Sequence, residues 1–401
     1  MSPPEATRLR TVEDLGDLAA KRVLVRCDFN VPLEDGRITD DLRIHATVPT
    51  LVDLLGRGAS LVLCSHLGRP KGKVVEALRL DSVADRLGEV MDREVLKLDD
   101  VVGPSVHDAA RGMRPGDVML LENLRFDPRE EANDSAFADE LASLADAYVD
   151  DAFGAAHRAH ASVVGVAERL PSAAGRLMQK EVEVLSRLRD GPDEPFLAIL
   201  GGAKVSDKLA AIDALIDRVD ALLIGGAMAF SFLAASGGEV GRSLVEPDRY
   251  DEVRTAVGKA EAKGVLIQLP EDVVAAPEAS VEARRQTVRA DAIPRDLMGL
   301  DIGPRTVEEF ARTIADARTI FWNGPMGVFE LEPFSAGTRG VALAVAGSKA
   351  YSVVGGGDSL AALRKLDLLD GIDHPSTGGG ASLEFLEGRE LPGVAVLMEK
   401  A

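Results

Sequence analysis

Residues 26–160 carry an arginine or a histidine at each position where the sequence suggests chemistry. They are Arg26, Arg43, His66, Arg69, Arg125, His157, Arg158 and His160. Guanidinium groups bind carboxylates and phosphates through forked N–H donors. These residues therefore indicate an anion site in the first half of the chain.

Four short motifs place basic residues directly after apolar runs that predict strands. The motifs are RCDFNVP (26–32), SHLGRP (65–70), LLENLRFDP (120–128) and DDAFGAAHRAH (150–160). Open α/β sheets bind ligands at the carboxyl ends of their strands. One arginine after a strand is usually a solvated loop charge, but four such strand ends favour an anion site. In the first motif Asp28 and Asn30 share one face. For these residues alone, an Asx turn that ends at Pro32 is an equally good interpretation.

Residues 200–380 carry short glycine clusters. They are GGAK (201–204), GGAM (225–228), NGPMG (323–327), GGGD (355–358) and TGGG (377–380). Glycine turns at the starts of helices bind phosphates through backbone N–H groups. Each cluster alone is a weak signal, since glycine turns are common in α/β folds. Together they predict a second anion site.

Charged side chains accompany these glycine clusters. ILGGAKVSDK (199–208) predicts a strand, a glycine turn and a helix start, with Lys204 and Lys208 on adjacent turns. Asp358 in GGGDS is positioned to meet Mg²⁺, which takes oxygen ligands. The chain contains no P-loop pattern and no protein-kinase motif set. WNGPMGVFE (322–330) predicts a rigid loop, for which a structural and a functional role are equally good interpretations.

Composition limits the classes of partner. The chain has 401 residues, of which 46% are hydrophobic and 28% charged, and its formal net charge is -20. That charge argues against nucleic acid or an anionic membrane as the main partner. The N-terminal MSPPEATRLR lacks an apolar core, so we expect no secretory signal. Cys27 and Cys64 lie in separate apolar runs, and we expect buried free thiols in a reducing cytoplasm.

One uncharged stretch approaches the length of a membrane span. It comprises the 18 residues 221–238, and a spanning helix needs about 20 apolar residues. The Gly225-Gly226 pair divides the stretch, so a buried strand, a turn and a helix are the better interpretation.

Strand-like and helix-like segments alternate along the chain. Apolar runs predict buried strands at 22–28, 60–65, 118–123, 147–152, 196–202, 221–226, 264–270, 319–324 and 351–357. Helical patterns such as TVPTLVDLLGRG and TVEEFARTIADA lie between them. This alternation is typical of an α/β protein with doubly wound parallel sheets.

A lobe boundary is predicted where a helical pattern meets a polar turn. Met178, Val182, Leu185 and Leu188 recur at helical spacing, and DGPDEP follows at 190–195. We therefore expect an N-terminal lobe over 1–174, a connecting helix over 175–190 and a C-terminal lobe over 191–389. The tail 390–401 is expected to pack back on the first lobe.

Taken in order, the motifs resemble the successive signatures of the phosphoglycerate kinase family. They are RCDFNVP, SHLGRP, LLENLRF, DAFGAAHRAHAS, GGAKVSDK, DIGP, WNGPMGVFE, GGGDS and STGGGASLEFLEG, and they cover the chain from about 22 to 393. Ser359 stands where threonine is more usual in the family. The resemblance implies two doubly wound, Rossmann-like lobes joined by a connecting helix and hinge. It also implies reversible phosphoryl transfer between 1,3-bisphosphoglycerate and ADP, which gives 3-phosphoglycerate and MgATP.

The resemblance also implies which residues form the two sites. The glycerate would be bound by Asp28, Phe29, Asn30, Arg43, His66, Leu67, Gly68, Arg69, Arg125 and Arg158. The nucleotide would be bound by Lys208, Gly299, Asn323, Glu330, Gly356, Gly357, Asp358 and Ser359, with Asp358 as the Mg²⁺ ligand. The catalytic groups would be Arg43, Lys204, Gly357 and Gly380.

The implied reaction needs no catalytic base. The acceptor is a carboxylate with a pKa of about 4, so it is already ionised at neutral pH. Positioning and neutralisation of the phosphoryl oxygens would then supply catalysis, and closure of the lobes would join the substrates. A cytoplasmic monomer is expected from the family.

Two other classes of function are alternatives. An NAD-dependent dehydrogenase would also be doubly wound, but it should carry G-x-G-x-x-G after an early strand, where this chain has RCDFN. A non-catalytic nucleotide-binding protein would not need both Arg43 and Lys204.

Overall fold

The computed structural model describes residues 8–399, and the chain divides into two compact units. Unit 1 contains residues up to 183 together with those from 390 onward, and unit 2 contains 184–389. Each unit is built on its own six-stranded sheet. The helix α6 (Arg176–Asp190) contributes residues to both units.

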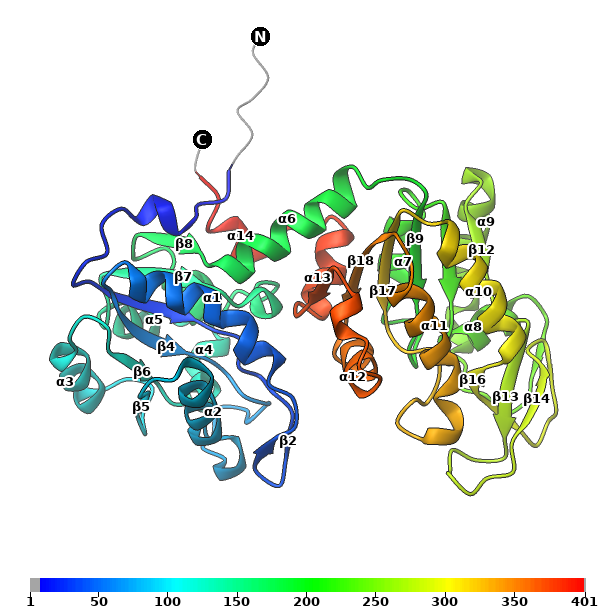
Figure 1. Ribbon diagram of the computed structural model, residues 1–401, viewed down its shortest axis with the longest axis horizontal. Coiled ribbons are helices and arrows are strands. Elements are labelled where there is room, and N and C mark those ends of the chain that lie inside the picture. Colours follow the sequence, from blue (N-terminus) through cyan, green and yellow to red (C-terminus); the bar gives the residue numbers. More distant parts are fainter. Residues whose placement is uncertain (1–7, 400–401) are drawn as a thin grey trace, which may run out of the picture. The chain divides into compact units, whose positions relative to one another are not determined.

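Unit 1 is a parallel sheet flanked by helices (Figure 1). Its strand order is β5-β6-β4-β1-β7-β8, and every neighbouring pair is parallel. The strands are β1 (Arg22–Arg26), β4 (Ser60–Cys64), β5 (Leu96–Lys97), β6 (Val118–Leu120), β7 (Ala147–Asp150) and β8 (Ser172–Ala174). The helices are α1 (Leu42–Gly56), α2 (Asp81–Met91), α3 (Pro104–Gly112), α4 (Pro128–Glu131), α5 (Ser135–Ala142) and α14 (Pro392–Ala395).

Short elements complete unit 1. A two-stranded antiparallel hairpin joins β2 (Leu33–Glu34) and β3 (Arg37–Ile38). The single-turn helices are η1 (Val12–Leu15), η2 (Glu76–Leu78), η3 (Leu124–Phe126) and η4 (Phe153–Ala155), and a π-helical turn forms η5 (Ala161–Gly165).

Unit 2 repeats the same architecture with strand order β12-β10-β9-β17-β18-β19, again all parallel. The strands are β9 (Phe196–Leu200), β10 (Ala221–Ile224), β12 (Leu266–Gln268), β17 (Thr319–Asn323), β18 (Tyr351–Gly355) and β19 (His374–Ser376). The helices are α7 (Leu209–Leu215), α8 (Met228–Ala235), α9 (Tyr250–Lys263), α10 (Pro304–Asp316), α11 (Ala336–Ala346), α12 (Gly357–Lys365) and α13 (Gly380–Leu386).

Two small sheets and three single-turn helices complete unit 2. β13 (Asp272–Ala276) pairs antiparallel with β14 (Gln286–Arg289) and with β16 (Met298–Ile302). β11 (Glu239–Val240) pairs with β15 (Ala292–Ile293). The single-turn helices are η6 (Pro247–Arg249), η7 (Glu332–Phe334) and η8 (Leu369–Gly371).

Each large sheet reverses its order at a central strand. β1 has β4 on one side and β7 on the other, and β9 lies in the same way between β10 and β17. At such a switch point the loops after neighbouring strands diverge, and a crevice opens at the carboxyl ends of the strands. The motifs of the sequence follow β1, β4, β6 and β7 in unit 1, and β9, β17 and β18 in unit 2.

The predicted α/β class with two doubly wound parallel sheets is confirmed, and all nine predicted strands are present. Each predicted strand ends earlier than expected, because its last predicted residues belong to the following loop.

The stretch 221–238 folds as β10, a turn and α8, and no helix in the described residues is long and apolar enough to span a membrane. Cys27 and Cys64 are buried free thiols, as expected. The antiparallel sheet of β13, β14 and β16 was not predicted.

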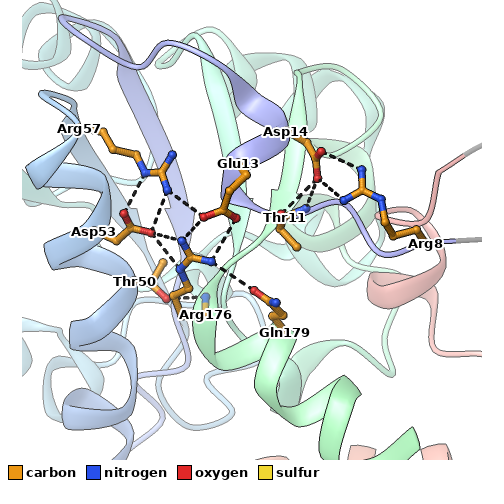
Figure 2. A network of polar contacts seen from close by, with 9 residues as sticks. All are labelled: Arg8, Thr11, Glu13, Asp14, Thr50, Asp53, Arg57, Arg176 and Gln179. Atoms are coloured by element: carbon orange, nitrogen blue, oxygen red, sulfur yellow. Dashed lines mark hydrogen bonds and ion pairs between the residues drawn. The ribbon is translucent and has the colours of Figure 1, made fainter.

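The start of α6 is held firmly within unit 1. Asp151, after β7, accepts hydrogen bonds through Oδ1 from the backbone N–H groups of Leu177 (2.9 Å) and Met178 (3.3 Å). Figure 2 shows Arg176 pointing toward Glu13 of η1 and Asp53 of α1, with both of which it forms ion pairs. The first turn of α6 is therefore fixed to three other elements of unit 1.

The C-terminal segment also lies in unit 1. The Gly393 N–H donates to the Ala156 carbonyl at 2.8 Å, next to η4. Arg10 donates from its side chain to the carbonyls of Leu397 (3.2 Å) and Val396 (2.6 Å). The two ends of the described chain thus pack side by side.

Candidate active site

The first strand end of unit 1 positions a carboxylate, an amide and a guanidinium. Asp28 and Asn30 follow β1, and Arg43 lies in the first turn of α1. Arg43 donates from Nη1 to Asp28 Oδ2, while Asp28 Oδ1 accepts from the Asn30 N–H at 3.3 Å. Asp28 therefore uses one oxygen for the Asx turn and the other for Arg43. The turn and a functional role for this motif are thus compatible interpretations. Asn30 Oδ1 accepts from the Gly68 N–H at 2.9 Å and links this loop to the next.

The loop after β4 carries His66, Gly68 and Arg69. His66 is buried, whereas Arg69 is exposed. The Phe29 N–H donates to Ser65 Oγ at 2.9 Å, which ties the loop after β1 to the end of β4. Gly68 has φ +64°, a conformation that favours glycine and turns the loop sharply.

Arg125 and Arg158 follow β6 and β7. Arg125 in η3 donates from Nη1 to the Gly68 carbonyl at 2.8 Å, and its Nε lies 3.3 Å from Glu131 Oε1. Arg158 donates from Nε to His157 Nε2 at 3.0 Å. Burial and then the charge of Arg158 lower the pKa of Arg125 to about 10. Arg125 therefore remains a cation at neutral pH, with a second cation close to it.

The pKa values of His66 and His160 are lowered by burial and by the positive charges around them. Burial, followed by the charges of Arg26, Arg125 and Arg43, holds the pKa of His66 well below its usual range. Burial and then Arg26 and Arg125 lower the pKa of His160 to about 4. Both rings are neutral at pH 7, and the arginines around them create a field that attracts an anion.

A cavity of about 460 Å³ lies in unit 2. Three of the predicted nucleotide residues, Gly299, Glu330 and Asp358, line it. The remaining lining residues are mostly apolar: Gly202, Ala203, Gly226, Ala227, Phe230, Arg242, Leu244, Pro270, Val273, Met298, Leu300, Asp301, Ile302, Pro325, Met326, Gly327 and Val328. A Cβ at position 299 would lie 2.1 Å from the Phe230 ring, so the wall needs glycine there. An apolar cavity with a few polar groups is typical of a small-molecule site.

Beside this cavity, a hydrogen-bonded cluster joins three of the glycine motifs. Lys208 donates from Nζ to the Asn323 carbonyl at 3.2 Å and also to Asn323 Oδ1. The Gly324 N–H donates to Ser359 Oγ at 2.7 Å, and Gly356 takes φ +92° at the start of α12. Burial lowers the pKa of Lys208 to about 8. The cluster thus holds a partly desolvated ammonium at the switch point of the sheet.

The other predicted residues of unit 2 lie on exposed loops and helix starts. Lys204 is exposed on the loop after β9. Gly357 and Asp358 are exposed in the first turn of α12, and Gly380 is exposed at the first residue of α13. Of these four residues, Asp358 alone is among those that line the cavity.

Comparisons with known proteins agree with this geometry. Residues 12–389 match the model of the family described as phosphoglycerate kinase. The chain belongs to the phosphoglycerate kinase family. It is 57% identical over 393 residues to the phosphoglycerate kinase of Thermomicrobium roseum, covering 98% of this chain and 100% of the relative. It is 58% identical over 391 residues to that of Rubrobacter xylanophilus, covering 98% of both chains.

Solved structures of the family agree over almost the whole chain. The phosphoglycerate kinase of Coxiella burnetii is 42% identical, with a TM-score of 0.85, and the match covers 97% of this chain and 99% of that one. The phosphoglycerate kinase of Pyrococcus horikoshii OT3 is 34% identical, with a TM-score of 0.87, and the match covers 97% and 98% of the two chains. The chain is a phosphoglycerate kinase enzyme of glycolysis, a transferase that converts 1,3-bisphosphoglycerate and ADP to 3-phosphoglycerate and ATP. A dehydrogenase and a non-catalytic nucleotide-binding protein are thereby excluded.

Members of the phosphoglycerate kinase family generally use a magnesium nucleotide. Within residues 8–399, no group of three or more His, Cys, Asp and Glu side chains could hold a metal ion. Mg²⁺ in kinases is usually bound by one or two carboxylates together with substrate phosphates and water. The exposed Asp358 carboxylate in the cavity wall fits that pattern, because the nucleotide would supply the remaining oxygens.

Sequence reasoning missed the residue that joins two of the basic loops. Asn123, within the LLENLRF motif, is fully buried. Its Oδ1 accepts from the N–H groups of Leu67 (3.2 Å) and Arg125 (3.1 Å), and its Nδ2 donates to the carbonyls of Leu67 (2.8 Å) and Leu78 (2.9 Å). The signal was its place two residues after the apolar run 118–121, where a buried amide seldom lies without backbone partners.

Proposed function

We propose that unit 1 binds 3-phosphoglycerate or 1,3-bisphosphoglycerate and that unit 2 binds the magnesium complex of ADP or ATP. The observation that carries this assignment is the pairing of chemistries: arginines and neutral histidines at the strand ends of unit 1, and a largely apolar cavity beside glycine turns in unit 2. A small acid with two anionic groups needs several fixed cations, whereas a nucleotide needs an apolar slot for its base and backbone N–H groups for its phosphates.

Within unit 1, we assign the hydroxyl and carboxyl end of the glycerate to Asp28 and Asn30. We assign its phosphate to His66, Arg69, Arg125 and Arg158. The bonds among the loops support this assignment. Gly68 accepts a hydrogen bond from Arg125 and donates one to Asn30, so groups for both ends of the substrate share one framework. Phe29, Leu67 and Gly68 serve the site by holding its loops in place, because their backbone N–H groups donate to Ser65, Asn123 and Asn30.

Within unit 2, we assign the ribose to Glu330 and the phosphates to Lys208, Asn323 and the 356–359 loop. Gly299 forms part of the cavity wall for the base. Asp358 would hold Mg²⁺, which when bound neutralises charge on the phosphate oxygens. Ser359 serves the site by supporting the loop at Gly324, because its hydroxyl already accepts a hydrogen bond from that N–H.

The chemical step then requires positioning rather than a base. The carboxylate acceptor is ionised at neutral pH, and the transferred phosphoryl group carries its charge on oxygens that need cations and N–H donors. Arg43, Lys204 and the N–H groups at Gly357 and Gly380 are the groups we assign to that charge. Since the two substrates belong to different units, transfer requires the units to close around them, with α6 as the connection. We further propose that the enzyme acts as a monomer in the cytoplasm.

Separate binding measurements test the assignment of substrates to units. Arg158→Met should weaken the binding of 3-phosphoglycerate by about tenfold to a hundredfold and leave the affinity for MgADP within about twofold. Glu330→Gln should do the reverse. Isothermal titration calorimetry with one substrate at a time measures both quantities. If either variant weakened both substrates equally, with its fold intact by circular dichroism, the division of labour between the units would be wrong.

A further inference from the structure

Arg26 is a buried arginine that forms hydrogen bonds to uncharged groups. It is the last residue of β1 and only 1% exposed. Its Nε donates to Ser162 Oγ at 2.9 Å, its Nη1 donates to the Cys27 carbonyl, and its Nη2 lies 3.0 Å from His66 Nδ1. It forms no ion pair with any residue in the described range 8–399. A buried charge is costly unless its hydrogen bonds are satisfied, so these three contacts fix the orientation of the guanidinium.

The chemistry of the two groups determines the direction of the Arg26–His66 hydrogen bond. A guanidinium has only donors, so His66 Nδ1 must accept. A neutral imidazole that accepts at Nδ1 carries its proton on Nε2. His66 Nε2 has no hydrogen-bond partner among residues 8–399. The ring therefore has one N–H group left to donate.

The surroundings of His66 also oppose a second proton on the ring. Arg26 comes from β1, Arg43 from α1, Arg125 from η3 and His160 from the segment before η5, and each lowers the pKa of His66. A proton on Nδ1 would also point at the donor of Arg26. The ring is therefore neutral at pH 7.

Ser162, which accepts a hydrogen bond from Arg26, is itself hydrogen-bonded to Glu130. Ser162 donates from Oγ to Glu130 Oε1 at 2.5 Å and from its N–H to Glu130 Oε2 at 2.9 Å. Glu130 in α4 is fully buried. Ser162 thus stands between the two charges. Arg26 is stabilised by the Glu130 carboxylate without direct contact, and its Nη2 stays directed at His66.

We propose that Arg26 is a positioning residue that holds His66 in the neutral tautomer protonated at Nε2, so that His66 offers a hydrogen-bond donor of fixed direction to the phosphate of the substrate. This inference rests on the proposed role of His66 as a substrate ligand. Its consequence is that the charge of this part of the site does not change with pH near neutrality. A phosphate monoester with a second pKa of about 6 can then bind as a dianion without altering the protein.

Nitrogen NMR of the wild-type enzyme tests the tautomer without any substrate. In ¹⁵N-histidine-labelled protein, the His66 signals are identified by their loss in His66→Gln. We expect an unprotonated Nδ1 and a protonated Nε2, both unchanged between about pH 5.5 and 8, although a free histidine titrates near 6.5. A proton on Nδ1, or a titration within that range, would overturn the proposal.

Substitution of Arg26 tests the functional consequence. Arg26→Lys keeps the charge but loses the fork that reaches both Ser162 and His66. We expect a mixture of His66 tautomers and about tenfold weaker binding of 3-phosphoglycerate, measured by calorimetry. Arg26→Met combined with Glu130→Gln removes both buried charges together and should show the same two effects if Arg26→Lys unfolds. Arg22→Met, at the other end of β1, is the matched control and should show neither effect.

The possible outcomes separate this inference from the function on which it rests. If the tautomer shifts in a folded Arg26 variant but the affinity for 3-phosphoglycerate does not, the positioning role is wrong. If His66→Ala binds 3-phosphoglycerate like the wild type, the ligand role of His66 is wrong. The positioning role of Arg26 then falls with it, even where the NMR shows the expected tautomer.

Discussion

Arg43 and Asp28 form a hydrogen-bonded ion pair in which the carboxylate side chain is 3% exposed and the guanidinium side chain 26% exposed. The buried carboxylate restrains the more exposed guanidinium. Asp28 is itself fixed by its bond from the Asn30 N–H. A guanidinium that is held in place before the substrate arrives loses less freedom in the transition state, and this lowers the barrier.

Arg43→Ala should therefore abolish most of the turnover. We expect kcat to fall by about 10²–10³, the typical cost of removing one fixed donor to developing charge. The affinity for MgADP should stay within about twofold, because Arg43 belongs to unit 1 and the cavity proposed for the nucleotide lies in unit 2. Steady-state kinetics and calorimetry measure these quantities. Asp28→Asn, which keeps Arg43 but weakens its restraint, should lie between the variant and the wild type. Substantial residual kcat in a folded Arg43→Ala enzyme would contradict the catalytic role.

Asn123 offers a second test, because its amide uses all four of its hydrogen bonds to join two basic loops. Asn123→Asp keeps both acceptor bonds but cannot donate to the carbonyls of Leu67 and Leu78. We expect a destabilisation of about 2–6 kcal/mol, from two carbonyls that lose their donor at about 1–3 kcal/mol each. KM for 3-phosphoglycerate should rise by about tenfold or more. KM for MgADP should not change. Urea unfolding and steady-state kinetics measure the two effects. A loss of stability without a rise in KM would show that Asn123 supports the fold and not the site.

The strands of the two large sheets could be predicted because each central strand is buried along most of its length. β4, β9 and β17 are fully buried, so their sequences are continuous apolar runs. Three of the four edge strands were not predicted, because β5 (LK), β8 (SAA) and β19 (HPS) contain no run of large apolar residues, whereas the edge strand β12 lies within the run GVLIQLP. The sheet of β13, β14 and β16 mixes polar and apolar residues, and its pairing is non-local.

For the candidate site, strand ends could be predicted but buried polar partners could not. Lys208 and Asn323 each lie within a recognisable motif, yet they are 115 residues apart, and no local pattern indicates that they form a hydrogen bond. Arg26 and Ser162, 136 residues apart, present the same problem. Such pairs depend on the order of strands within the sheet, which a single sequence does not specify.

Asp150 should make the stability of unit 1 depend on pH. The carboxyl group is buried at the end of β7 with one oxygen lacking a hydrogen-bond partner among the described residues, and burial raises its pKa to about 7. In the unfolded chain the group ionises near pH 3.9. The folded state therefore holds a proton that the unfolded state releases between about pH 4 and 7. Its contribution to stability is full below pH 4 and is lost as the pH rises to 7.

Asp150→Asn, a neutral isostere of the protonated acid, should remove the part of this dependence that Asp150 contributes. The adjacent Asp151, whose pKa burial also raises to about 7, should keep its own part. We expect the variant to be more stable than the wild type at pH 8 by about 1–4 kcal/mol and to lose that advantage near pH 4. Urea unfolding across this range measures the difference. An identical pH dependence in the two proteins would mean that Asp150 is ionised in the folded state.

The ion pairs at the start of α6 should contribute modestly and in a salt-dependent way. Arg176 pairs with Glu13 and Asp53, and Arg57 pairs with the same two carboxylates (Figure 2). These side chains are partly exposed, so each pair contributes about 0–1 kcal/mol. Arg176→Met removes two such pairs and should lower the free energy of unfolding by up to about 2 kcal/mol at low salt and by less at high salt.

A matched control for Arg176 lies on α10. Arg312 forms a single exposed pair with Glu309 of the same helix. Arg312→Met should change the free energy of unfolding by less than about 0.5 kcal/mol at any salt concentration. Equal losses in the two variants would show that the network around Arg176 is worth no more than an isolated surface pair.

The lowered pKa of Lys208 should make the affinity for MgADP depend on pH. Burial lowers its pKa to about 8, so the ammonium is mostly charged at pH 7 and mostly neutral at pH 9. If Lys208 contacts the phosphates, bound MgADP should favour the charged form, and the affinity should fall by about tenfold as the pH rises from 7 to 9. Lys208→Arg keeps its charge throughout this range and should give a flat profile, because a guanidinium does not deprotonate there. Calorimetry with MgADP at a fixed excess of Mg²⁺ measures both profiles. A flat profile in the wild type, or parallel profiles in the two proteins, would place Lys208 outside the phosphate site and leave its bonds to Asn323 as its only role.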